Sequence, residues 1–395
     1  MFQSTRLTGE RPNSSEPEVP PTSLATLLAQ RSRARPGETM FRGGEAGRQR
    51  SDAATSNRMV EGLAGRLASL RLPGGSPIAI AMGVGPDAPQ AILAAGRAGL
   101  TPCLVPVAAG DADLDAMLDA CGAAAVVTQT RIGDLRPAET MCRLAAGRFG
   151  LRFVLAFGDD PPEGVIMLRP DMPEAAPGLR NPGAVVTFAK SGTGPIALIR
   201  NDLSLVAAAS TVIRTARIRP GDVIATALAQ DDLKGLGTGL VAALAAGAAL
   251  ETGEHLFAPH LLTFDPTERV HLVLPGWAAP IVAAHDLQAR AASIILVDDA
   301  DQPDPISPVA IRGGRVVDVL ALGEVICLAS LRSTDGLAEP SRRRLASLPG
   351  DRLTRVRIVG DRVEASGIAT EARRYRRPAD PGSGGWRDAG AIATF

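Results

Sequence analysis

The stretch SPIAIAMGVGPDAPQAILAAGRAGLTPCLVPV, residues 76–107, decides the fold class. Its apolar runs at 76–82 and 101–107 have the length of buried strands, and residues 87–99 between them have the pattern of a helix. Asp87 is typical of a helix start, and Gly99 is typical of a helix end. Strand, helix and strand in this order predict two parallel strands with the helix packed on one face of the sheet.

The same alternation extends in both directions along the chain and predicts an α/β protein with largely parallel sheets. After about residue 315 the pattern changes to short β-like runs, RVVDVLAL, EVICLASLR, TRVRIV and DRVEASG, which predict a smaller β-rich section. Helices are predicted at 23–32, 53–70, 111–121, 203–218, 236–250 and 277–287, and further strands at 124–130, 153–158, 184–190, 222–228, 270–274 and 293–297.

These patterns divide the chain into four parts. Residues 1–22 are polar, rich in Ser, Pro and Glu, and predict a flexible tail. A first αβ subdomain is expected at 23–182, because residues 161–182 are rich in proline and acidic side chains and indicate a linker or surface loop. A second αβ subdomain is expected at 183–314, and the β-rich section at 315–395.

Composition excludes several classes of protein. Hydrophobic residues make up 45% of the 395 residues and charged residues 21%, which is a globular balance rather than that of a disordered chain. The 42 basic and 42 acidic residues cancel, which argues against nucleic acid as the main partner. Only Lys190 and Lys234 are lysines, so there are two places for a catalytic lysine.

The compartment is predicted to be the cytoplasm. Residues 1–22 lack the apolar segment of a secretory signal, and the apolar run at 236–250 is too short to span a bilayer. The cysteines have no metal or redox spacing and are expected to be reduced thiols, and the histidines form no zinc signature. The cysteines are Cys103, Cys121, Cys142 and Cys327, and the histidines are His255, His260, His271 and His285.

Two glycine-containing loops follow predicted strands. MGVGPDA, residues 82–88, places Gly83, Gly85 and Ala88 at the spacing of a dinucleotide fingerprint. Pro86 interrupts it, and no acidic residue ends the next strand, so an ordinary turn is the simpler interpretation. AKSGTGP, residues 189–195, can present hydroxyls and backbone N–H groups to a phosphate, although it is not a Walker A loop. Its alternative interpretation is also an ordinary loop.

The order of segments over about residues 23–395 resembles the N-terminal domain of the adenylate-forming superfamily, which includes acyl-CoA synthetases and other AMP-dependent ligases. AVVTFAKSGTGPIALIRNDLSLVAAA resembles the family's phosphate loop and following helix, and GLGTGLVAALAAGAALE resembles the helix after its PLFHxxG segment. DVLALGEV lies where the family has YGxTE, and GWRDAGAIATF aligns with GWFRTGD. The resemblance implies two packed αβ sheets plus a smaller β-rich subdomain.

In this family ATP and a carboxylate give an acyl adenylate, and a thiol such as coenzyme A then takes the acyl group. The resemblance therefore implies ATP or AMP with Mg²⁺ if the site is retained, and no cofactor otherwise. The nucleotide would bind to Ser191, Gly192, Thr193 and Gly194 with Lys190 beside them, and Glu324 would be the Mg²⁺ ligand. The implied substrate cleft is Asp232, Gly235, Leu236, Gly276 and Trp277, bordered by residues 297–300, with Leu240 and the turn at 275–277 offering apolar surface.

Most of the family's functional residues are replaced. The phosphate loop is shortened and lacks its lysine, and Asp232 lies where the family has a histidine. Only Glu324 of the YGxTE pattern remains, and the ribose-binding aspartate is replaced by Ala391. The family's C-terminal domain with its adenylation lysine is expected to be absent. Since loss of one preorganised charge or donor costs about 10²–10³ in rate, little adenylation is expected.

Three interpretations remain. The first is a catalytically degenerate homologue, a pseudoenzyme that acts by binding a ligand or a partner. The second is an active carboxylate-adenylating ligase that borrows its C-terminal domain from another chain, and the third is an unrelated α/β enzyme that uses the Gly83 loop for a dinucleotide. The expected partner is an acyl or carboxylate small molecule, a carrier protein or a separate C-terminal domain, with neither nucleic acid nor a membrane span, and a homo-oligomer is left open.

Overall fold

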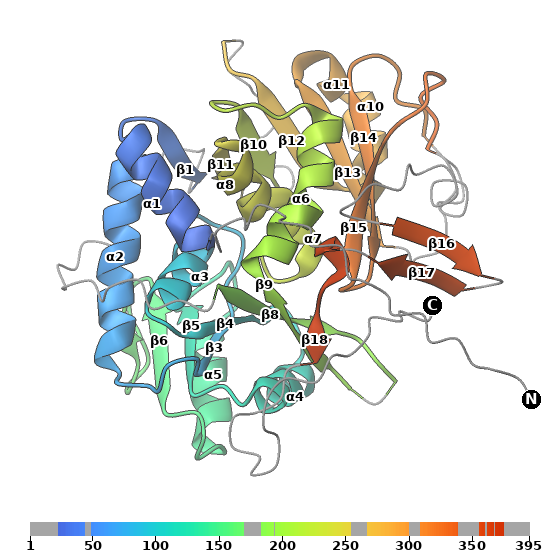
Figure 1. The fold of residues 1–395 in the computed structure, drawn as a ribbon. Helices are drawn as coiled ribbons and strands as arrows, with labels where there is room; N and C mark the ends of the chain where they lie inside the picture. Colours follow the sequence, from blue (N-terminus) through green and yellow to red (C-terminus); the bar gives the residue numbers. More distant parts are fainter. Residues whose placement is uncertain are drawn as a thin grey trace, which may run out of the picture.

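The computed structural model describes residues 23–43, 49–169, 183–192, 194–253, 267–299, 309–338, 355–359, 362–366 and 368–374. It contains two eight-stranded sheets and a separate two-stranded pair (Figure 1). The predictions for residues 1–22, Thr193, Ala300 and the C-terminal segment 383–395 lie outside the described residues. None of the described helices has the length and apolar character that crossing a bilayer requires.

One sheet is built around the stretch quoted from residues 76–107. Its strand order is β18-β9-β8-β4-β3-β5-β6-β7, and the five consecutive neighbours from β8 to β6 pair in parallel. Its strands are β3 (Pro77–Ile80), β4 (Thr101–Leu104), β5 (Ala125–Gln129), β6 (Phe153–Phe157), β7 (Ile166–Met167), β8 (Ala184–Ala189), β9 (Ile196–Asn201) and β18 (Arg373–Arg374). The antiparallel partner of β8 is β9, which the sequence did not predict.

The second sheet has the order β15-β14-β13-β12-β10-β11-β1-β2. Its members from β14 to β1 run parallel, and each edge carries one antiparallel strand, β15 or β2. Its strands are β1 (Thr39–Gly43), β2 (Gln49–Asp52), β10 (Val223–Thr226), β11 (Ala249–Thr252), β12 (Val270–Pro275), β13 (Ser293–Asp299), β14 (Val316–Leu322) and β15 (Ile326–Leu331). The separate pair is β16 (Arg355–Val359) with β17 (Arg362–Ser366).

The helices fall into three groups. The central group is α1 (Leu24–Ala34), α2 (Ala53–Ser69), α3 (Asp87–Arg97), α6 (Asp202–Ala216), α7 (Leu233–Leu236), the π-helical turn η2 (Gly237–Val241) and α8 (Ala242–Ala246). The outer helices of the first sheet are α4 (Asp111–Cys121) and α5 (Pro137–Ala146), and those of the second are α10 (Ala279–Ala284) and α11 (Leu287–Arg290). Single 3₁₀ turns are η3 (Gly276–Ala278) and η4 (Ile368–Thr370).

Alternation along the strands produces the layers. In β3, Ile78 and Ile80 face the core that both sheets share, whereas Ala79 faces a second core with α4 and α5. In β13, Ile295 faces the shared core and Leu296 faces α10 and α11. Because parallel strands are buried on both faces, each sheet needs helices on both sides. The result is five layers, with the central helices between the two sheets.

The sheets do not follow the predicted subdomain boundaries. Strands β8 and β9, from the expected second subdomain, belong to the first sheet. The hairpin of β1 and β2, from the expected first subdomain, forms an edge of the second sheet, and β14 and β15 join that sheet from the expected β-rich section. The helix predicted at 236–250 is shorter than expected, because residues from Ala249 form β11. Strand pairing between distant segments decides these points, and local sequence does not encode it.

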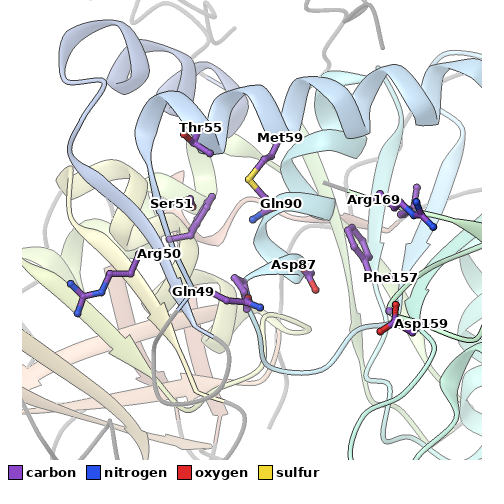
Figure 2. A pocket seen from close by; sticks show the side chains of 14 residues that line it. Gln49, Arg50, Ser51, Thr55, Met59, Asp87, Gln90, Phe157, Asp159 and Arg169 are labelled. Carbon is purple, nitrogen blue, oxygen red and sulfur yellow. The ribbon is translucent and has the colours of Figure 1, made fainter. Parts of the chain in front are cut away.

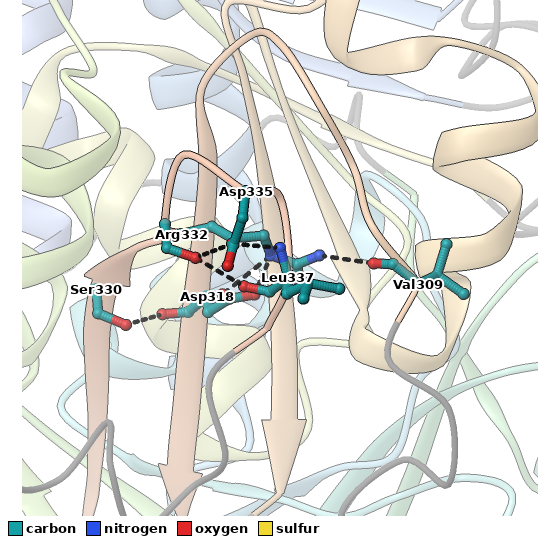
Figure 3. Close-up of polar contacts among 7 residues, drawn as sticks. Val309, Asp318, Ser330, Arg332, Asp335 and Leu337 are labelled. Atoms are coloured by element: carbon teal, nitrogen blue, oxygen red, sulfur yellow. Dashed lines mark hydrogen bonds and ion pairs between the residues drawn. The ribbon is translucent and has the colours of Figure 1, made fainter.

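The hairpin of β14 and β15 is fixed by a buried ion pair (Figure 3). Arg332 donates to both carboxylate oxygens of Asp318, with Nη2 2.6 Å from Oδ1 and Nε 3.1 Å from Oδ2. The two side chains are only 4% and 2% exposed. Arg332 Nη1 also donates to the Val309 carbonyl at 3.4 Å. This pair therefore ties the edge strand and the preceding loop to the sheet.

We expect the Asp318→Ala variant to lower the free energy of unfolding by about 3 kcal/mol, because it leaves the Arg332 charge buried and unpaired. Urea denaturation monitored by circular dichroism would measure this loss. The control is Arg143→Ala, which breaks the ion pair with Asp111, where both side chains are more than half exposed. That control should cost less than about 0.5 kcal/mol, and equal losses in the two variants would contradict the assignment.

Candidate functional site

Part of the predicted site, from Asp232 to Glu324, lies at one edge of the second sheet, whereas the predicted loop at 190–194 follows β8 of the first sheet. Strands β10, β12, β13 and β14 are parallel, so their carboxyl ends meet at the same edge. Asp232 follows β10, Gly276 follows β12, Asp299 ends β13 and Glu324 follows β14. Carboxyl ends of parallel strands are where α/β proteins usually bind ligands.

The loop after β8 is closed on itself. Ser191 Oγ donates to the Gly194 carbonyl at 2.6 Å, and Gly194 N–H donates to the Ser191 carbonyl at 3.2 Å. Gly194 has a φ of +115°, which favours glycine. A Cβ atom at Gly192 would meet no atom within 4 Å, so this side of the loop is open. Lys190 beside the loop is exposed.

Lys234 connects an aspartate that follows β10 with an aspartate that ends β13. Its Nζ lies 2.7 Å from Asp299 Oδ2 and 3.2 Å from Asp232 Oδ2. Asp232 also caps α7, because its Oδ1 accepts from Gly235 N–H at 2.8 Å. Burial by itself would lower the pKa of Lys234, but the two carboxylates outweigh it and raise that pKa above its ordinary value. Since β12 lies between β10 and β13, this bridge passes over the carboxyl end of β12.

Glu324 is held inside the same edge. Its Oε2 accepts from Leu233 N–H at 3.0 Å. The pKa of Glu324 is raised to about 7, first by burial and then by the Asp232 charge, while the Arg200 charge opposes the shift. The Thr187 hydroxyl of β8 lies near Glu324. It forms no hydrogen bond of good geometry with any described residue. Thr187 precedes the phosphate-type loop on β8, so Glu324 lies beside the strand that leads into that loop. A shared site of the loop and Glu324 stays a prediction.

Two further charged groups accompany Glu324, and the sequence analysis did not name them. Asp231 is a second carboxyl whose pKa is raised to about 7, first by burial and then by the Asp232 charge. Arg200 on β9 is 1% exposed, and its guanidinium nitrogens have no hydrogen-bond partner among the described residues. Burial lowers the pKa of Arg200, and the Glu324 charge opposes that shift. The sequence signal that could have indicated Arg200 is a single arginine at the end of the otherwise apolar run IALIR, residues 196–200.

The predicted cleft residues lie at this edge, but protein atoms fill the space around them. A Cβ atom at Gly235 would lie 1.7 Å from the Ala229 carbonyl oxygen, and one at Gly276 would lie 1.5 Å from Asp298 Oδ1. Leu236 and Leu240 are fully buried in the shared core, so neither supplies the expected apolar pocket surface. Among the predicted cleft residues, all of which the structure describes, only Trp277 offers apolar surface to a ligand or partner, because its side chain is 65% exposed.

The residues at this edge do not fit Mg²⁺ and ATP well. No group of three or more metal-ligating side chains is arranged to hold a metal among the described residues. The Lys234 ammonium is paired with two carboxylates, and Asp231 and Glu324 add acidic character where a triphosphate would need cations. The assignment of Glu324 as a Mg²⁺ ligand stays a prediction.

The Gly83 loop is covered from one side. Gly83 N–H donates to the Gln129 side chain at 2.9 Å, and a Cβ atom at Gly83 would lie 3.1 Å from two carbons of Ile132. Asp87 in the first turn of α3 places a carboxylate where a pyrophosphate would bind. These contacts argue against the dinucleotide interpretation.

Known structures share this fold. The N-terminal domain of FACL13 from Mycobacterium tuberculosis has a TM-score of 0.67 at 16% identity, with 93% of this chain and 96% of that one covered. The anthranilate CoA ligase AuaEII in complex with anthranoyl-AMP has a TM-score of 0.66 at 14% identity, with 87% and 67% covered. Acetoacetyl-CoA synthetase from Streptomyces lividans has a TM-score of 0.62 at 14% identity, with 75% and 51% covered.

No protein-family model matches the sequence, and no curated protein matches it. The chain therefore has the fold of the N-terminal domain of adenylate-forming acyl-CoA ligases, as the order of its segments predicted. At these identities the similarity establishes the fold alone.

The raised pKa of Glu324 predicts a pH-dependent stability. The folded protein holds this proton up to about pH 7, whereas the unfolded chain releases it near pH 4.5. The contribution of Glu324 to the free energy of unfolding is therefore fully present below about pH 4.5 and is lost as the pH rises through about 7. Between pH 5.5 and 7.5, Glu324 should lower the free energy of unfolding by about 2 kcal/mol.

Urea unfolding of the wild type and of Glu324→Gln at these two pH values would measure the effect. The variant should lose about 2 kcal/mol of the pH dependence, because glutamine keeps the size and has no proton to lose. Glu163→Gln at an exposed loop position is the matched control and should behave as the wild type. An unchanged pH dependence in Glu324→Gln would contradict the burial of this carboxyl.

Proposed function

We propose that this chain is a non-adenylating relative of the adenylate-forming ligases, and that it acts by binding a partner rather than by forming an acyl adenylate. The observation that carries the proposal is the bridge from Lys234 to Asp232 and Asp299. It crosses the edge at the carboxyl ends of the parallel strands, where α/β proteins usually bind their ligands. A nucleotide at this position would have to displace two short ion pairs.

Electrostatics support the same conclusion. Stabilising a transferring phosphoryl group needs preorganised cations and N–H donors aimed at its oxygens. Here the ammonium of Lys234 is already neutralised, and the Arg200 guanidinium is enclosed beside Glu324. AuaEII was solved in complex with anthranoyl-AMP. In our proposal this chain does not bind such an adenylate, because its charged groups at this edge pair with one another.

The filled edge favours a protein partner over an enclosed small molecule. Asp298 fills the space beside Gly276, and the leucines expected to line an apolar pocket are buried in the core. Trp277, on the turn after β12, remains 65% exposed beside this edge. An exposed tryptophan is a frequent anchor of protein interfaces. We therefore place the partner surface around Trp277.

Isothermal titration calorimetry with Mg-ATP tests the proposal without a guess about the carboxylate. The expected result is no saturable heat up to about 1 mM nucleotide, a concentration that corresponds to about 4 kcal/mol of binding free energy. Circular dichroism of the same sample shows that the protein is folded.

Micromolar Mg-ATP binding would overturn the proposal and favour the active ligase that borrows its C-terminal domain. In that case Lys190→Met should weaken the binding, because Lys190 is the exposed cation beside the Ser191 loop. Asp113→Asn, at an exposed position in α4, is a control that should leave it unchanged.

A further inference from the structure

A second place on the molecule has the form of a ligand site. It is a pocket of about 700 Å³ between the β1–β2 hairpin, the start of α2, the start of α3 and the end of β6 (Figure 2). A volume of this order accommodates a small organic molecule. Its lining includes Met59, Asp87, Gln90, Phe157 and Leu168.

The pocket is separate from the sheet edge described above. It shares no lining residue with that edge, and it lies at β2, the opposite end of the second sheet from β13 and β14. Five strand steps separate β13 from β2, which at about 4.8 Å per step is roughly 24 Å. The hairpin is fixed here by close packing, since a Cβ atom at Gly43 would lie 2.7 Å from Pro86 Cδ.

The inner charge of the pocket is negative. Asp87, in the first turn of α3, is half-buried, and its carboxylate has neither an ion pair nor a hydrogen bond with the described residues. Burial raises the pKa of Asp87, and no neighbouring cation offsets this. The other charged lining residues, Arg50, Asp159 and Arg169, are exposed. A cationic group placed beside Asp87 would supply the missing partner.

A buried amide on the same helix also lacks a partner. Gln90 is 2% exposed, and its Oε1 makes no hydrogen bond with the described residues. Its side chain lies between Met59 and Asp87 in the close-up (Figure 2). A buried acceptor without a donor destabilises the folded protein, and a ligand N–H group would remove that penalty. Rotation of the amide would present this oxygen to an N–H donor in the pocket.

The remaining lining surface restricts the ligand. Phe157 and Leu168 are each 3% exposed and, with Met59, offer an apolar wall. An anion is disfavoured because it would face the Asp87 carboxylate at the helix start. A second positive charge is disfavoured by Arg50 and Arg169, which lie on opposite sides of the pocket (Figure 2). A metal ion is disfavoured because no cluster of three ligating side chains is present among the described residues.

We propose that this pocket binds a small-molecule primary amine, with the ammonium beside Asp87 and Gln90 and an apolar body against Phe157, Met59 and Leu168. The ammonium has three donors and one positive charge, which match one carboxylate and one amide oxygen. The aromatic ring of Phe157 favours an aromatic body. The site is independent of the proposed partner binding, so either proposal can fail without the other.

Phenethylamine is a suitable probe, and its binding to the full chain can be followed by saturation-transfer difference NMR and calorimetry. Two matched compounds of similar shape, neutral 2-phenylethanol and anionic 3-phenylpropionate, test the role of charge. The expected order places the amine at least 10-fold tighter than either, because a charge-assisted hydrogen bond contributes about 1.5–3 kcal/mol. Equal binding of all three, tighter binding of the anion, or no binding of the amine would overturn the proposal.

Asp87→Asn removes the charge and keeps the side-chain size. It should weaken phenethylamine at least 10-fold and leave 2-phenylethanol unchanged, a split that general unfolding would not produce. The matched control is Asp113→Asn, which makes the same change in the first turn of α4, also an 11-residue helix. Should Asp87→Asn fail to fold, Met59→Trp fills the pocket from α2 and should abolish binding; amine binding retained in either folded variant contradicts the site.

Discussion

The shared apolar core between the two sheets is the constraint on which the rest of the structure depends. Parallel strands must bury both faces, and here one layer of helices covers a face of each sheet. Helix α6 contributes Leu205, Ala209 and Val212 to this core, which also contains Ile80 from one sheet and Val273 from the other. Because the two sheets pack on common helices, their edges are held in fixed positions. The charged cluster around Lys234 and the pocket at Asp87 both lie at the ends of strands that this core fixes.

Burial of charge explains why the edge of the second sheet is closed. An isolated buried charge is costly, so buried charges persist where others compensate them. Lys234 satisfies Asp232 and Asp299, and Glu324 accepts a backbone N–H and lies close to Arg200. The Lys234 ammonium and its two carboxylates thus compensate one another at this edge. At Asp87 the cost of burying a charge is not compensated, because no described group pairs with the carboxylate and a pocket lies beside it.

The sequence predicted most helices and strands correctly in outline, whereas the site that it named stays a prediction. Helices and strands with strong apolar periodicity, such as α4 and β13, lie where they were expected. The hairpin of β1 and β2 was missed because both strands are short, and QRSD of β2 is polar, as suits the edge strand of a sheet. Strand β11 was merged with the preceding helix because an apolar run does not by itself distinguish a helix from a strand. Asp232 and Glu324 were named from the resemblance, whereas Arg200 acquires its unusual environment from burial and from the distant Glu324.

By itself, the sequence determined the α/β class, the parallel pairing around residues 76–107 and the scarcity of lysine. These properties follow from local periodicity and residue identity, which need no knowledge of distant contacts. Only the tertiary structure decided which sheet each strand joins, that Lys234 spans from α7 to β13, and that Asp87 faces a pocket without a cation beside it. Strand pairing and charge compensation join residues far apart in the chain, and their energies depend on burial and distance. Neither the burial of a side chain nor the distance between two charges can be read from the order of the residues.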